Sequence, residues 1–86
     1  MSQSKILIVE DESIIAEDLA DSLRVMGYMV IDIVSSAEEA ILIAVEKQPN
    51  LILMDVMLQG KMDGITAAEQ IHLSSQIPII FLTAYT

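Results

Sequence analysis

Residues 50–64, N-L-I-L-M-D-V-M-L-Q-G-K-M-D-G, decide the fold of this chain. They contain four consecutive apolar residues, 51–54, and a short unbroken apolar run is typical of a strand buried on both faces of a parallel sheet. Asp55 follows where that run ends. A carboxylate at this point lies at the carboxyl-terminal rim of the sheet, where open α/β sheets bind ligands. The alternative is that Asp55 only ends a strand or begins a turn.

A second buried-strand run precedes an acidic group. Residues 5–9, K-I-L-I-V, are followed by Glu10, Asp11 and Glu12. If the two strands are neighbours, Glu10 and Asp11 converge on Asp55, and at least one carboxyl pKa rises unless a cation is present. Mg²⁺ accepts a few carboxylates and water as ligands, so a magnesium site is predicted. The alternative is that these acids favour the positive amino end of the next helix, and both can hold.

A third run, I-P-I-I-F-L at residues 77–82, is followed by Thr83. A hydroxyl at the end of a strand can reach an anion at the rim, although threonine is also common in strands. Three strands that end in an acidic pair, a single aspartate and a threonine are more specific than any one of these features.

These stretches resemble the receiver domain of two-component response regulators, through I-L-I-V-E-D-E, L-I-L-M-D, M-D-G and P-I-I-F-L-T-A. The resemblance implies that Asp55 accepts a phosphoryl group from a sensor histidine kinase or a phosphotransfer protein. It implies Mg²⁺ as cofactor, with Asp11 as a direct ligand and Glu10 acting through water. Met57 would offer its backbone carbonyl to the metal. Thr83 would hydrogen-bond the phosphoryl oxygens.

Two features depart from the family pattern. The loop after Asp55 is one residue longer than usual, with Leu58 where proline is common, although this change lies beyond Met57. Family members also continue to a further strand, whose lysine pairs with the phosphoryl group and which carries an aromatic switch residue. We therefore expect residues 1–86 to be one receiver domain, truncated or incompletely covered at its carboxyl end, without the fifth strand and last helices.

The resemblance and the alternation of strands and helices predict an α/β fold, a doubly wound parallel sheet of flavodoxin-like type with strand order 2-1-3-4. Asp32 would lie on the edge strand, where a charge discourages aggregation. Ser36 and Glu39 form a capping-box pattern. We expect strands at residues 5–9, 28–34, 51–54 and 77–82, and helices at 13–26, 36–47 and 64–73. The expected buried faces contain Ile15, Leu19, Leu23 and Met26 on the first helix, and Ile65, Ala68 and Ile71 on the third.

Composition narrows the possible functions. Four basic and 13 acidic residues give a net charge of -9, which argues against direct nucleic-acid binding by this segment. The absence of cysteine excludes disulfides and thiolate metal sites. Neither a secretory leader nor an apolar run long enough to span a bilayer is evident, so we expect a cytoplasmic protein without membrane contact.

His72 lies on the third expected helix, away from the rim, and is interpreted as a surface or packing residue.

The leading hypothesis is a phosphorylation-dependent switch rather than an enzyme, acting on a downstream effector domain or protein. An aspartate-nucleophile phosphatase would need a second carboxylate two residues after Asp55, where Met57 stands. A receiver-like interaction module that is not phosphorylated remains possible, although Glu10, Asp11, Asp55 and Thr83 are all present. A flavin-binding module would need a serine- and threonine-rich loop after the first strand.

The fourth strand suggests a further property. Residues 79–82, I-I-F-L, are strongly apolar and lack a charge that would discourage pairing at an exposed edge. We therefore expect residues 1–86 alone to be marginally stable and to self-associate through this strand.

Overall fold

The computed structural model describes residues 3–58 and 60–82. Strands and helices alternate along the chain, as predicted. The elements are β1 (Lys5–Val9), α1 (Ser13–Val25), β2 (Met29–Val34), α2 (Ala37–Lys47), β3 (Leu51–Asp55), α3 (Gly64–His72) and β4 (Ile79–Leu82). Asp55 is itself the last residue of a strand, whereas Tyr28 and residues 77–78 lie just outside the strands expected to contain them.

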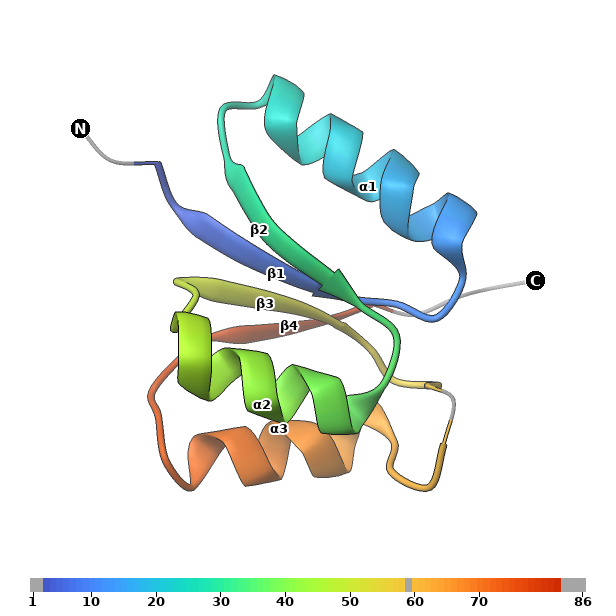
Figure 1. Cartoon of the computed structure of the whole chain (residues 1–86), viewed down its shortest axis with the longest axis vertical. Coiled ribbons are helices and arrows are strands. Elements are labelled where there is room, and N and C mark those ends of the chain that lie inside the picture. Colours follow the sequence, from blue (N-terminus) through green and yellow to red (C-terminus); the bar gives the residue numbers. More distant parts are fainter. Residues whose placement is uncertain (1–2, 59, 83–86) are drawn as a thin grey trace.

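The four strands form one parallel sheet in the order β2-β1-β3-β4, which confirms the predicted topology. Helix α1 lies on one face of this sheet, and α2 and α3 lie side by side on the other (Figure 1). Val9 pairs with Val34 on one side and with Met54 on the other. The carboxyl ends of β1, β2 and β3 are therefore level at one rim.

Alternate strand residues face opposite sides of a sheet, so each face has its own core. On the α2 and α3 face the buried strand residues pack mainly against alanines and Ile71; this cluster contains Leu7, Val9, Val34, Ala37, Ala40, Ala44, Ile52, Met54, Ala67 and Ile71. On the α1 face the buried cluster contains Ile6, Ile8, Ala16, Ala20, Leu23 and Leu53. Among the described residues, no helix is both long and apolar enough to cross a membrane.

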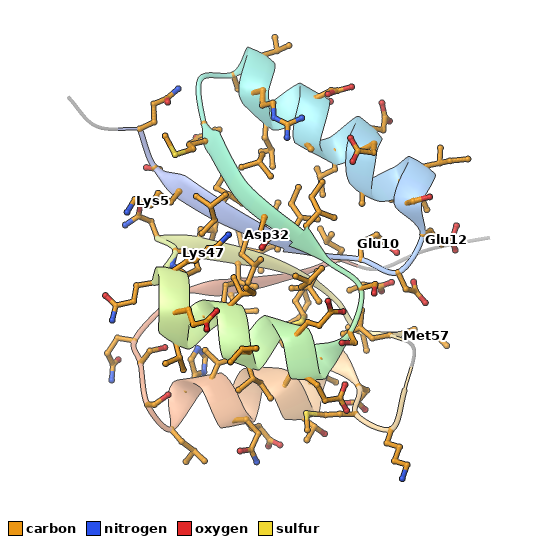
Figure 2. All side chains as sticks on the ribbon, viewed as in Figure 1. Lys5, Glu10, Glu12, Asp32, Lys47 and Met57 are labelled. Atoms are coloured by element: carbon orange, nitrogen blue, oxygen red, sulfur yellow. The ribbon has the colours of Figure 1, made fainter. Side chains whose placement is uncertain are left out.

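The two ends of the sheet differ in charge. Figure 2 shows Glu10, Glu12 and Met57 gathered at the carboxyl-terminal rim, and Lys5 at the opposite end. Lys47 ends α2 and also lies away from that rim. The acidic residues singled out in the sequence are thus held on the side of the sheet where ligands bind in folds of this class.

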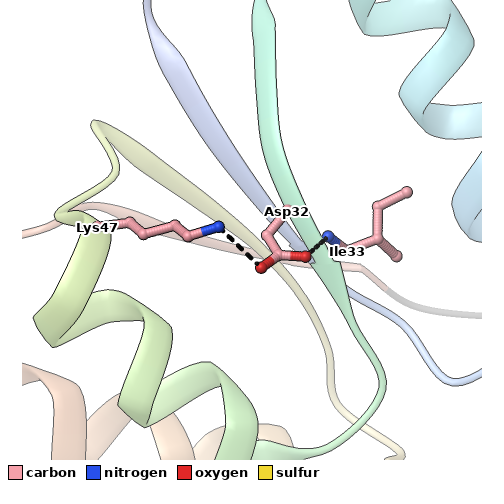
Figure 3. Close-up of polar contacts among 3 residues, drawn as sticks. All are labelled: Asp32, Ile33 and Lys47. Atoms are coloured by element: carbon pink, nitrogen blue, oxygen red, sulfur yellow. Dashed lines mark hydrogen bonds and ion pairs between the residues drawn. The ribbon is translucent and has the colours of Figure 1, made fainter.

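The edge strand β2 is protected from pairing with a further strand by a charged residue and by an irregularity in its pairing with β1. Ile6 pairs with Val30 but Leu7 pairs with Asp32, so Ile31 is passed over in the register. Asp32 Oδ1 accepts a hydrogen bond from the Ile33 amide at 2.8 Å, and Asp32 Oδ2 pairs with Lys47 Nζ at 3.2 Å (Figure 3). This confirms the edge position predicted for Asp32, and bulges and charges discourage further strand pairing.

The opposite edge is formed by β4. In the part of the chain that the structure describes, β4 pairs with β3 and has no strand on its other side. Ile80 and Phe81 remain 52% and 41% exposed. This edge is therefore apolar, and neither of these side chains carries a charge.

Candidate functional site

Asp55 is positioned by the end of a buried strand. It is paired in register with Leu82 of β4, and its neighbour Met54 is fully buried. Asp55 is only 8% exposed, and its Oδ1 accepts a hydrogen bond from the Met57 amide at 3.2 Å. The chain turns away immediately after the strand, so the carboxyl group is directed to the rim rather than into the core.

Glu10 and Asp11 lie at the junction between β1 and α1. The Glu10 amide donates to the carbonyl oxygen of Val34 at 2.9 Å, which ties this residue to the end of β2. Its side chain is folded back on the loop, because Glu10 Oε2 accepts a hydrogen bond from the Glu12 amide at 3.1 Å. Glu10 is only 7% exposed. The sequence explains this placement, since a carboxylate directly follows four strand residues that must be buried.

The three carboxyl groups converge as predicted. Glu10, Asp11 and Asp55 each offer one oxygen, and these atoms all lie within 4.8 Å of one another. Such a set of oxygen ligands suits a hard divalent cation. The structure therefore supports the first reading of Asp55, a member of a rim site, over the reading in which it only ends a strand.

The pKa of the Glu10 carboxyl group is raised to about 7. Burial of the carboxyl group is the main cause, and the negative charge of Asp55 and hydrogen bonds with Asp11 and Asp55 act in the same direction. The hydrogen bond from the Glu12 amide opposes the rise. One carboxyl pKa is thus raised as expected, although burial contributes more than the like charge on which the expectation was based.

Three further residues were singled out in the sequence, Met57 and Thr83 as site residues and His72 as a surface or packing residue. The Met57 side chain is 80% exposed, and its backbone lies at the same rim as Glu10 (Figure 2). Thr83 lies outside the described residues, so its contact with a phosphoryl group stays a prediction. His72 is exposed at the end of α3, with Nε2 3.1 Å from the carbonyl oxygen of Ile77, which agrees with a packing role.

The loop after Asp55 contains residues whose structural roles were not predicted from the sequence. Leu58, the departure from the family pattern, is partly buried and packs with Met62 against the core of the α2 and α3 face. Asp63 caps α3, since its Oδ1 accepts from the Thr66 amide at 2.8 Å, and this bond lowers the pKa of Asp63. The lengthened loop is therefore anchored at its apolar residues and at the start of α3. The available signal was the pair of apolar residues, Leu58 and Met62, on either side of residues 59–61.

Comparison with known proteins agrees with this geometry. The chain matches the response regulator receiver domain family over residues 6–86. It is 40% identical over 83 residues to the phyllosphere-induced regulator PhyR of Methylorubrum extorquens, covering 95% of this chain and 31% of that protein. It is 39% identical over 82 residues to the transcriptional regulatory protein PdtaR of Mycobacterium tuberculosis, covering 95% of this chain and 40% of that protein. The chain thus spans well under half the length of these relatives.

Solved structures show the same fold. The response regulator PhyR from Brucella abortus aligns with a TM-score of 0.90 and 31% identity, covering 98% of this chain and 35% of that one. The signal receiver domain of a modulated diguanylate cyclase from Desulfovibrio desulfuricans aligns with a TM-score of 0.90 and 34% identity, covering 99% and 68%. With its parallel sheet, its rim of three carboxyl groups and these matches, the chain belongs to the response regulator receiver domain family.

Proposed function

We propose that this chain is a phosphorylation-dependent signalling switch in which Asp55 accepts a phosphoryl group from a histidine kinase or a phosphotransfer protein. The observation that carries the proposal is the convergence of Glu10, Asp11 and Asp55 within 4.8 Å at the carboxyl-terminal rim. Membership of the receiver domain family supports the same role. Phosphoryl transfer depends mainly on positioning and charge stabilisation, and this rim can provide both.

The same carboxyl groups fit Mg²⁺. Asp11 and Asp55 would be direct ligands, Glu10 would act through water, and Met57 would contribute its backbone carbonyl. When bound, the ion would supply positive charge that offsets the repulsion between the carboxylates and an incoming phosphoryl group. Support comes from the donor set, which consists of oxygen atoms alone.

The chemical step assigned to Asp55 is a displacement at phosphorus. A carboxylate oxygen attacks the phosphorus of a phosphorylated histidine, an O–P bond forms and the N–P bond breaks. The imidazole leaves as the neutral base when its other nitrogen carries a proton. The Met57 amide, bonded to Asp55 Oδ1, holds the carboxyl group in a fixed orientation during this step. Thr83 would then hydrogen-bond the phosphoryl oxygens.

The output of the switch is proposed to be a change in affinity for an effector domain or protein. An acyl phosphate adds charge and acceptor oxygens, which bias a two-state element. The PhyR protein from Bartonella quintana has been crystallised with the anti-sigma factor NepR, so one relative has a protein partner. For this chain, with its net charge of -9, a protein partner in the cytoplasm is favoured over direct contact with nucleic acid.

The experiment is phosphorylation by a small acyl phosphate in the presence of Mg²⁺, followed by intact mass spectrometry. We expect one added phosphoryl group on the wild type and none on Asp55→Asn. Asp63→Asn is the matched control, because it removes a carboxylate from the same loop while asparagine still caps a helix. Thr83→Ala should retain some labelling but show a weaker conformational response.

Two results would contradict the proposal. Undiminished labelling of Asp55→Asn would place the acceptor elsewhere. A wild-type protein that binds Mg²⁺ but accepts no phosphoryl group from either an acyl phosphate or a phosphorylated kinase would instead favour a receiver-like interaction module.

A further inference from the structure

Gly64, the first residue of α3, is buried and lies against the backbone of the acceptor residue Asp55. Its amide donates a hydrogen bond to the carbonyl oxygen of Val56 at 2.9 Å. The glycines with positive φ in the described chain are Gly27 and Gly60, so Gly64 adopts a backbone conformation that other residues can also adopt. Conformational freedom is therefore not the reason that glycine is needed at this position.

The reason is space. A methyl group at Gly64 would overlap the carbonyl oxygen of Asp55. It would also lie 3.0 Å from Met54 Cγ and 3.0 Å from the Cα atom of Val56. Two of these three obstacles are backbone atoms, which cannot rotate away as the end of a flexible side chain can. The first turn of α3 is therefore in contact with the main chain of the acceptor residue itself.

Neither partner in this contact can easily withdraw. Helix α3 is held against the sheet by Ala67 and Ile71, which are 0% and 2% exposed, and its start is fixed by the Asp63 cap. On the other side, Met54 pairs with Val9 of β1 and with Phe81 of β4. Added bulk at Gly64 would therefore press on the end of β3 and the turn after it, because the Asp55 carbonyl oxygen is the nearest obstacle. That is the segment that carries Asp55.

We propose that Gly64 is a positioning residue for the acceptor, and that the absence of a side chain there sets the distance of Asp55 from Glu10 and Asp11. The proposal rests on the proposed function of this rim. A shift of Asp55 changes a set of oxygen atoms that lie within 4.8 Å of one another. Residues that orient metal ligands without touching the metal commonly alter metal affinity by about 10–100-fold when changed.

The test compares Gly64→Ala with two controls by titration with Mg²⁺. For Gly64→Ala we expect Mg²⁺ affinity to fall by about tenfold or more, because the ligand carboxylates lose their relative placement. Gly27→Ala also loses a glycine, but it lies in the turn between α1 and β2, where an added methyl group meets nothing within 4 Å. Its positive φ makes the substitution destabilising, yet Mg²⁺ affinity should stay within about twofold because distant sites act independently.

Ile65→Ala is the second control, since Ile65 follows Gly64 on α3 and is 51% exposed. It should change Mg²⁺ affinity by no more than about twofold. All variants are first checked for folding by circular dichroism, and trimethylamine N-oxide is added where a variant is partly unfolded, because this osmolyte favours the compact state. Wild-type Mg²⁺ affinity in folded Gly64→Ala would overturn the proposal.

Two further outcomes are decisive. If Gly64→Ala fails to fold even with the osmolyte, Gly64 is required for the fold rather than for placing Asp55, and the proposal is wrong. If the wild type binds Mg²⁺ but is not phosphorylated, while Gly64→Ala binds Mg²⁺ more weakly, the proposed phosphoryl transfer fails but the positioning role of Gly64 stands.

Discussion

Glu10 is the residue that links the rim site to pH. Its pKa rises from 4.5 to about 7 in the folded chain, chiefly because burial disfavours the charged form. A group with a raised folded-state pKa contributes stability that is fully present below its unfolded pKa. That contribution is lost as the pH rises through about 7. Ionised Glu10 is therefore a cost to the folded state that a bound cation can offset.

We expect the stabilisation by Mg²⁺ to increase with pH. Near pH 5.5 the ion competes with the proton on Glu10, whereas near pH 8 the Glu10 carboxylate is ionised. With Mg²⁺ at about tenfold excess over its Kd, the free energy of unfolding at the higher pH should increase by about 1.4 kcal/mol. Thermal melting with and without Mg²⁺ at both pH values measures this. Glu10→Gln should reduce the pH dependence, and Asp11→Asn should lose most of the gain. An identical shift in Asp11→Asn and wild type would remove Asp11 from the metal site.

At the scale of single elements, the buried faces of the helices were harder to predict than their positions. The large apolar residues of α1 indicated a face with Ile15, Leu19, Leu23 and Met26. Leu23 is buried and Leu19 packs against the core, as predicted, but Ile15 and Met26 are 43% and 64% exposed. Ala16 and Ala20 are buried instead, one position further along the helix. Small side chains let a helix lie close to the sheet, and the larger residues then flank the contact. Alanine carries little periodic signal, so the pattern of large residues indicated the wrong centre of the face.

Helix α3 shows the same effect. Ala68 and Ile71 are buried as predicted, but Ile65 is half exposed and Gly64 and Ala67 lie against the sheet.

The cap at the start of α2 was predicted better than the buried faces, because capping depends on neighbouring residues alone. Ser36 Oγ accepts a hydrogen bond from the Glu39 amide at 3.2 Å. The Glu39 carboxylate differs from the capping-box pattern, since it accepts from the hydroxyl groups of Ser35 and Ser36.

This cap supplies a test at the level of the helix. We expect Ser36→Ala to lower the free energy of unfolding by about 1 kcal/mol, because the Glu39 amide loses its acceptor. Ser35→Ala is the control: its hydroxyl contacts Glu39 Oε1 at 3.2 Å but accepts no amide of α2, so a smaller loss is expected. Urea unfolding of both variants measures the difference. Equal losses would show that the contacts with the carboxylate matter, and not the cap.

For the whole molecule, the strand order could be predicted from the resemblance to receiver domains. The meeting of Glu10, Asp11 and Asp55 then followed, because neighbouring parallel strands bring their carboxyl ends to one rim. The course of the loop after Asp55 could not be predicted, since the burial of Leu58 depends on packing against a core whose residues are far apart in the sequence. The contact between Gly64 and the Asp55 backbone could not be predicted either, because a sequence pattern does not reveal an interatomic distance.

The exposed edge of β4 leads to a prediction about assembly. A chain of residues 1–86 should self-associate as its concentration rises, because β4 offers an unpaired apolar edge in the described fold. Phe81→Lys should weaken the association by placing a charge on this strand. Ile65→Lys is the control, since it adds the same charge to an exposed position on α3. Light scattering over a concentration series measures the effect, and a wild-type chain that stays monomeric at high concentration would contradict the prediction.

The bulge and the ion pair on β2 determine how far such an assembly can grow. With Ile31 passed over and Asp32 held by Lys47, the β2 side of the sheet is a poor template for another strand. Within the described fold, β4 is then the one edge of the sheet that can accept a further strand. Two copies that pair through β4 around a twofold axis cover each other's β4 edge. The edges that remain exposed are then those of β2, which pair poorly with another strand. We therefore expect a closed dimer rather than a filament.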